Sequence, residues 1–189
     1  MRISACYIVK NEAENVKRSI SSIRGQVDEI VVVDTGSTDR TVAIASGLGA
    51  NIYDFVWQDD FASARNYALS KATGDWIVLL DADEYFSADT SCNLRKVIGV
   101  YGESSCNGLL VKMDNIDAAS GELLDSFYQL RLVRRQPGLA YQGRIHEELL
   151  RDGKSLDNLY KVSQDVLRIV HTGYALSLPP SSLARSAGL

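Results

Sequence analysis

The chain has 189 residues and a formal net charge of −4, and 46% of its residues are hydrophobic against 23% charged. This length fits one α/β domain with a full core, or one domain with a short appendage, and the composition is that of an ordered globular protein. The basic residues are scattered along the sequence, which argues against nucleic-acid binding and against a basic membrane-binding stretch. No segment approaches the length of a transmembrane span.

The three cysteines, Cys6, Cys92 and Cys106, show no C-x-x-C spacing. Reduced thiols in a cytoplasmic protein are therefore expected, rather than a disulfide framework or a zinc site. The apolar run 3–9 is too short for a secretory signal and passes directly into polar residues, so it predicts a first strand.

The first half of the chain alternates apolar runs with helical patterns. Strands are expected at residues 3–9, 28–34, 51–56 and 76–80. Helices are expected at about residues 12–23, 38–46 and 60–71. Ser37 or Thr38 is the expected N-cap of the second helix, and the third is expected to turn Phe61, Ala64, Ala68 and Leu69 inward.

The second half is less regular. A helix is expected at 88–100, with strands at 108–113, 127–133, 141–149 and 166–171, some of them antiparallel. Residues 175–189 lack periodicity and are expected to be a disordered tail or a linker after a domain at 1–174. The order predicts an α/β fold, a Rossmann-like and mostly parallel sheet with helices on both faces and a small antiparallel portion.

In such sheets ligands lie beyond the carboxyl ends of the strands, and Asp81-Ala82-Asp83 follows the run 76–80. In extended chain, residues two apart point the same way, so both carboxylates are expected to face one point. Paired carboxylates there suit Mg²⁺ or Mn²⁺, which keep positions open for diphosphate oxygens. A solvated acidic turn is the alternative. The place after a strand, with Glu84 adjacent, favours the metal site.

Two other side chains are candidates for the nucleotide. Asp34 ends the run 28–34, and its carboxylate can accept hydrogen bonds from a ribose hydroxyl or a base N–H, although a turn is the competing interpretation. Arg65 follows small residues and can lie against a base or a diphosphate. A surface ion pair with Asp59 or Asp60 is its alternative.

The last candidates end predicted strands of the second half. His171 can supply a third metal ligand beside Asp81 and Asp83, which would favour Mn²⁺ over Mg²⁺, or it can be structural. Glu147 and Glu148 end another strand. A carboxylate there can take the proton from an acceptor hydroxyl, or both can be exposed acids beside a hairpin.

Together these residues resemble the family 2 glycosyltransferases of GT-A fold. The matching runs are IVKNEAEN at 8–15, VVVDTGSTD at 31–39, WQDDFASARN at 57–66, LLDADE at 79–84 and HTGY at 171–174. The third and last runs resemble the bacterial branch that includes lipopolysaccharide-core glucosyltransferases and peptide S-glycosyltransferases. The match covers about residues 2–174.

The resemblance implies inverting transfer from a nucleotide-diphosphate sugar, with uracil as the base, to a hydroxyl or thiol of a glycan, lipid-linked or peptide acceptor in cell-surface glycan synthesis. It also implies a cytoplasmic enzyme that is peripheral to the inner membrane through its acceptor. The residues that would border the base and ribose are Val9, Asn11, Glu12, Asp34 and Asp81 with Ala82. Arg65 would reach the nucleotide, Asp83 and His171 would hold Mn²⁺ or Mg²⁺, and Glu147 would be the base.

Other functions fit the motifs less well. A haloacid-dehalogenase phosphatase wants Thr or Val soon after its D-x-D, whereas Glu84-Tyr85-Phe86 follows here. No Gly-rich dinucleotide loop or P-loop is present. Related chains continue past H-x-G-Y into a helical segment, and this chain ends fifteen residues after Tyr174. A non-catalytic nucleotide-sugar or glycan-binding module, left by truncation of the acceptor side, is therefore the main alternative.

Overall fold

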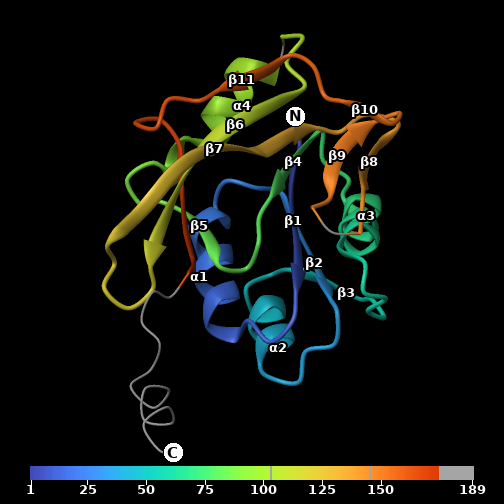
Figure 1. Ribbon diagram of the computed structural model, residues 1–189, viewed down its shortest axis with the longest axis vertical. Coiled ribbons are helices and arrows are strands. Elements are labelled where there is room, and N and C mark those ends of the chain that lie inside the picture. The colour runs from blue at the N-terminus through green and yellow to red at the C-terminus, as the bar shows by residue number, and fades with distance from the viewer. Residues whose placement is uncertain (103, 145, 175–189) are drawn as a thin grey trace, which may run out of the picture.

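A computed structural model describes residues 1–102, 104–144 and 146–174 (Figure 1). Its strands are β1 (Ile3–Val9), β2 (Glu29–Asp34), β3 (Asn51–Asp54), β4 (Trp76–Leu79), β5 (Glu84–Phe86), β6 (Gly108–Asp117), β7 (Leu123–Arg134), β8 (Leu139–Gln142), β9 (Glu148–Arg151), β10 (Lys154–Ser155), β11 (Leu159–Lys161) and β12 (Arg168–Tyr174). Its helices are α1 (Ala13–Ile23), α2 (Thr41–Gly47), α3 (Phe61–Lys71) and α4 (Leu94–Gly102), with a short 3₁₀ helix (Ser91–Asn93) before α4.

The main sheet has the strand order β3-β2-β1-β4-β7-β6-β12-β5, and β11 pairs with β6. Strands β3, β2, β1 and β4 are parallel neighbours. The second half adds antiparallel pairs on both sides of β7 and between β12 and β5. The predicted mostly parallel sheet with an antiparallel portion is confirmed. Strands β8, β9 and β10 form a separate small sheet.

Helices cover both faces of this sheet, because its inner strands are apolar on both sides. In β2, Ile30 and Val32 belong to the core cluster that contains the buried side chains of α1, α2 and α4. The alternate residues Val31 and Val33 belong to the cluster that contains Ala68 of α3. Figure 1 shows α3 set apart from α1 and α2 accordingly.

The sheet brings distant segments to one edge. The register of β1 and β2 pairs Val9 with Asp34, so the loops that follow both strands leave at the same level. Strand β5 pairs with β12, with Glu84 opposite His171. This pairing places His171 beside the chain that leaves β4.

The start of α2 corrects the predicted cap. The helix begins at Thr41, and Asp39 accepts hydrogen bonds from the backbone N–H of Thr41 at 2.9 Å and from its hydroxyl. Ser37 and Thr38 instead bond to Asn11: Ser37 Oγ accepts from its N–H at 2.9 Å, and the Thr38 N–H donates to its Oδ1 at 2.7 Å. The two side chains join neighbouring loops rather than starting a helix.

Three other expectations are corrected. The strand expected at 141–149 is a hairpin of β8 and β9, because the chain turns between Gln142 and Glu148. The helix expected at 88–100 begins at Leu94, after the 3₁₀ turn. Phe61, in the first turn of α3, is 47% exposed, and its ring packs against that of Trp57 rather than turning inward.

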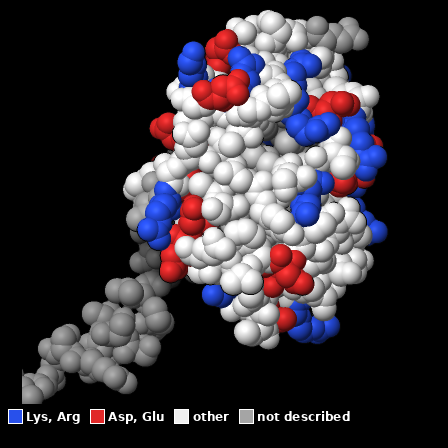
Figure 2. All heavy atoms as spheres, turned by 90° about the vertical axis from the view of Figure 1, so that its right-hand side faces the viewer, with Lys and Arg blue, Asp and Glu red and all other residues white. Residues whose placement is uncertain are grey.

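The expected tail, residues 175–189, lies outside the described residues. Within the described ranges, no helix is both long and apolar enough to cross a membrane. Figure 2 presents the face that carries α3 and the small sheet, and on this face acidic and basic side chains are interspersed rather than gathered by sign.

Candidate functional site

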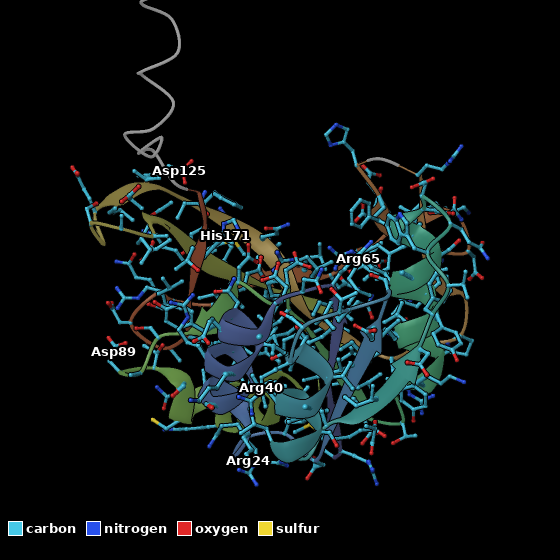
Figure 3. The ribbon with its side chains drawn as sticks, turned by 90° about the horizontal axis from the view of Figure 1, so that it is seen from below. Arg24, Arg40, Arg65, Asp89, Asp125 and His171 are labelled. Carbon is cyan, nitrogen blue, oxygen red and sulfur yellow. The ribbon has the colours of Figure 1, made fainter. Side chains whose placement is uncertain are left out.

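A cavity of about 510 Å³ opens at the carboxyl ends of β1 and β4. The residues predicted from the sequence that line it are Val9, Glu12, Arg65, Asp81, Ala82, Asp83 and His171. Trp57 and Phe61 add an aromatic wall, with their rings edge to face at 4.8 Å between centroids. Figure 3 shows Arg65 and His171 on opposite sides of this end of the molecule, on α3 and β12. The cavity stands where ligands of open α/β sheets bind.

Asp83 and His171 meet at the cavity. His171 Nε2 lies 3.2 Å from Asp83 Oδ2. The backbone N–H and the hydroxyl of Thr172 both donate to the carbonyl of Asp83 at 3.1 Å, which fixes the two chains against each other. The hydrogen bond with Asp83 raises the pKa of His171 above its ordinary value, although partial burial opposes this. The imidazole therefore stays protonated to a higher pH than a free histidine does.

A chain of polar side chains continues behind His171. Its Nδ1 lies 2.8 Å from Oδ1 of Asn115 in β6, and Nδ2 of Asn115 donates to Asp125 of β7 at 2.5 Å. Asn115 is buried and Asp125 is exposed. The sequence gives no periodic or motif signal for either residue, because both roles depend on the register of three strands.

The space in front of the Asp83–His171 pair is kept open by Gly173. A Cβ placed on Gly173 would lie 2.6 Å from His171 Nε2 and closer still to Asp83 Oδ2. Carboxylate and imidazole are both good ligands of Mn²⁺. A methyl group on residue 173 would lie too close to both ligand atoms, so glycine leaves free the place that a cation bound to both would occupy. The residues present therefore fit a divalent cation that takes two protein ligands and completes its coordination with ligand oxygens.

Asp81 does not join this pair, which corrects the expectation of two carboxylates facing one point. The chain after β4 is a turn rather than an extended segment, since the N–H of Glu84 donates to the carbonyl of Asp81 at 3.1 Å. Asp81 Oδ1 accepts from Arg65 at 2.8 Å, and Oδ2 lies 3.6 Å from Arg131. In the described part of the chain, no three His, Cys, Asp or Glu side chains converge, so the candidate cation site has two protein ligands.

The arginines also set the charge of Asp81. Burial would raise the pKa of its carboxyl, but Arg65 and Arg131 outweigh burial and hold this pKa below its ordinary value. Asp81 is therefore an anion that anchors two guanidinium groups at the edge of the cavity.

Arg131 and Glu84 form a buried ion pair beneath the cavity. The sequence did not predict this pair. The side chains of Arg131 and Glu84 are 8% and 2% exposed. Burial raises the pKa of Glu84 to about 7, although Arg131 opposes this shift. Glu84 is identifiable in the sequence as a third acid, but Arg131 lies in a strand that the sequence predicts only by its apolar residues.

Arg65 connects the cavity to the small sheet. Its Nε donates to Glu147 Oε1 at 2.8 Å, while its second contact is with Asp81, so neither alternative partner predicted for it, Asp59 or Asp60, is used. Asp60 caps α3 by accepting from the N–H of Ser63 at 3.2 Å. Glu147 is largely buried, with its side chain 16% exposed, and it stands behind Arg65 rather than in the described lining of the cavity.

Asn66 secures the same connection. Its side chain donates to the carbonyl of Tyr141 at 2.9 Å and accepts from the N–H of Tyr141 at 2.7 Å. Because Asn66 follows Arg65 on α3, one helix turn holds both β8 and the segment that carries Glu147.

Asp34 and Asn11 shape the loops beside the cavity. The Asp34 carboxylate accepts from the N–H groups of Gly36 at 3.1 Å and Ser37 at 3.0 Å. Gly36 has φ +107°, which a glycine adopts without strain. Both predicted residues are thus placed next to the lining residues Val9 and Thr35, with their polar atoms engaged in loop hydrogen bonds.

Known proteins are similar to this chain in sequence. The model of glycosyl transferase family 2 matches residues 4–138. A TPR repeat-containing protein of Synechococcus elongatus is 39% identical over 146 residues, which cover 77% of this chain and 35% of that protein. The SPbeta prophage-derived glycosyltransferase SunS of Bacillus subtilis is 30% identical over 174 residues, which cover 91% of this chain and 40% of SunS. The chain thus spans two fifths or less of the length of these curated relatives.

Solved structures show the same fold. S. aureus TarS, residues 1–349, aligns with a TM-score of 0.54 and 24% identity over 66% of this chain and 38% of that one. Glucosyl-3-phosphoglycerate synthase of Mycobacterium tuberculosis, in complex with Mn²⁺ and UDP-glucose, aligns with a TM-score of 0.59 and 16% identity over 96% of this chain and 73% of that one. With the family model matched across most of the sequence, this chain belongs to glycosyl transferase family 2.

Proposed function

We propose that this chain is the donor-binding domain of a metal-dependent, inverting glycosyltransferase that uses a UDP-sugar. The observation that carries the proposal is the Asp83–His171 pair, 3.2 Å apart at the cavity, with open space in front of it that a side chain on Gly173 would fill. Two proteins of similar fold support the choice of donor: S. aureus TarS has been solved with UDP-GlcNAc, and the mycobacterial synthase with Mn²⁺ and UDP-glucose.

The donor residues follow from their places around the cavity. Val9, Glu12 and Ala82 line it beside the aromatic wall of Trp57 and Phe61, which offers a stacking surface for a base. Asn11 and Asp34 hold the loops that border the ribose, and Asp81 would meet the ribose while it anchors Arg65. Arg65 lines the cavity beside its partner Asp81, so its guanidinium can turn to the nucleotide.

Asp83 and His171 would hold Mn²⁺ or Mg²⁺ on the diphosphate. When bound, the cation would supply Lewis-acid stabilisation of the charge that develops on the leaving nucleotide. Asp83 contributes a hard oxygen, and His171 contributes Nε2 after its proton leaves. Asp81 is left out of this ligand set because its two oxygens face Arg65 and Arg131.

Glu147 is the proposed general base. Oε1 accepts from Arg65, so we assign the proton of the acceptor hydroxyl or thiol to Oε2. A well-placed base contributes about 10²–10⁴-fold in rate. The acceptor would be a glycan, a lipid-linked group or a peptide. A cytoplasmic location remains a prediction, supported by three unpaired cysteines in the described residues.

Donor turnover separates this function from a non-catalytic binding module. The purified chain is incubated with a panel of UDP-sugars and Mn²⁺, and released UDP is measured with and without an acceptor panel. We expect metal-dependent UDP release that is lost in Asp83→Ala. A Glu147→Ala variant should bind donor normally and transfer about 10²–10⁴-fold more slowly. A chain that binds UDP-sugars but never releases UDP would be the binding module instead.

A further inference from the structure

A polar network behind His171 runs across three strands. Cross-strand register sets it: Asn115 of β6 is opposite Asp125 of β7 on one side and opposite His171 of β12 on the other. The three side chains therefore lie in one row on one face of the sheet. Figure 3 shows Asp125 and His171 on the same side of the molecule, away from Arg65.

The direction of the hydrogen bonds in this row is fixed at its outer end. An ionised carboxylate accepts hydrogen bonds and donates none, so the Asn115 group that faces Asp125, at 2.5 Å, must be the NH₂. The carbonyl oxygen of Asn115 then faces His171 Nδ1 at 2.8 Å. An amide oxygen only accepts, so Nδ1 must carry the proton of this bond.

A histidine that carries its proton on Nδ1 offers the lone pair of Nε2 to a metal. We propose that Asp125 and Asn115 are positioning residues that hold His171 with Nδ1 protonated and Nε2 presented beside Asp83. The metal-binding consequence rests on the proposed function, whereas the orientation of the imidazole does not. Outer partners of this kind fix the tautomer and ring orientation of metal-bound histidines.

A simpler role would be to staple β6 to β7. The two roles differ in one respect, because an amide in place of Asp125 keeps a hydrogen bond to Asn115 but no longer dictates its direction. The Asn115 side chain could then flip and present its NH₂ to His171 Nδ1. A staple would tolerate Asp125→Asn, while a direction-setting residue would not.

The first experiment measures Mn²⁺ binding to the full chain in the presence of UDP, by the loss of the free-Mn²⁺ electron paramagnetic resonance signal. Asp125→Asn should weaken Mn²⁺ binding about 10-fold, the lower end of the effect of removing outer partners. Asp114→Asn is the matched control. The Asp114 carboxylate on β6 accepts a hydrogen bond from Ser126 on β7. This pair is next to the Asn115–Asp125 pair in the register of the same two strands, so the control also removes a carboxylate from a cross-strand hydrogen bond. Its Mn²⁺ affinity should stay near wild type.

A double exchange tests direction itself. In N115D/D125N the carboxylate stands next to His171 and the amide stands outside, so the central side chain can only accept from Nδ1. The double variant should recover wild-type Mn²⁺ affinity, although it contains the damaging Asp125→Asn change. Equal losses in Asp125→Asn and Asp114→Asn, or a double variant as weak as Asp125→Asn, would overturn the proposal.

A second measurement does not need the metal. Nitrogen-15 chemical shifts of histidine report which ring nitrogen is protonated, and this chain has only two histidines. In an Asp83→Ala background, which removes the carboxylate beside Nε2, neutral His171 should be protonated at Nδ1, and adding Asp125→Asn should produce a mixture. Unchanged shifts would refute the positioning role. Correct shifts without any Mn²⁺ binding by the wild-type chain would leave the positioning role standing and refute the proposed function.

Discussion

The buried carboxyl of Glu84 gives the protein a measurable dependence of stability on pH. Its side chain is 2% exposed, and burial raises its pKa from 4.5 to about 7 even with Arg131 beside it. In the unfolded chain this pKa returns to about 4.5, so the folded state binds more protons than the unfolded state between these two values. The free energy of unfolding must therefore fall as pH rises through this window.

The size of this fall follows from the shift. Each pKa unit corresponds to about 1.36 kcal/mol, so a shift from 4.5 to about 7 corresponds to about 3 kcal/mol. A Glu84→Gln variant does not titrate, and its side-chain oxygen can still accept from Arg131. Relative to wild type, this variant should gain about 3 kcal/mol in free energy of unfolding between pH 4.5 and pH 7.5.

Urea unfolding at several pH values across this window measures the difference. Glu122, an exposed glutamate in the turn after β6, provides the control. Comparing wild type with Glu122→Gln in the same way measures the effect of losing one exposed carboxylate, which is then separated from the effect of burial. If the free energies of unfolding of wild type and Glu84→Gln changed in parallel from pH 4.5 to 7.5, the raised pKa of Glu84 would be refuted.

Three further predictions concern the metal pair and the thiols. Gly173→Ala should abolish Mn²⁺-dependent UDP binding, measured by calorimetry, because the added methyl group meets Asp83 and His171 at the cavity. The melting temperature should stay close to wild type. Tight binding by this variant would place the cation elsewhere. Apparent Mn²⁺ affinity should rise with pH through the neutral range, since the raised pKa of His171 means that a proton must leave Nε2 first; a flat titration would exclude His171 as a ligand. A thiol reagent should modify exposed Cys92 quickly and buried Cys6 only on unfolding, because burial raises the pKa of the Cys6 thiol; mass spectrometry of the labelled native chain would contradict this if Cys6 reacted first.

The sequence was informative where one segment carries its own signal. The valine run of β2 and the apolar run of β4 predict buried parallel strands, and their flanking acids locate the edge of the sheet that carries the cavity. His171 was a candidate ligand because it ends a predicted strand, and the resemblance to family 2 glycosyltransferases supported that role. It stands far from Asp83 in sequence but 3.2 Å away in space.

What the sequence could not supply depends on contacts between distant segments. Asn115 and Asp125 acquire their positions only through the register of β6 with its two neighbours. The role of Arg131 as the partner of Glu84 becomes visible only when β7 pairs with β4 and so lies beside the turn that follows β4. The simple alternation rule failed at Asp81 and Asp83 because the chain turns directly after β4. Local periodicity describes strands, whereas the site is built where strands end.

Calorimetric titration of UDP into the purified chain, with Mn²⁺ and again with EDTA, tests the central claim most directly. The account predicts binding that needs Mn²⁺ and disappears in Asp83→Ala, because Asp83 and His171 supply the protein ligands of the cation. UDP binding of equal strength with Mn²⁺ and with EDTA, or binding that survives intact in Asp83→Ala, would contradict it.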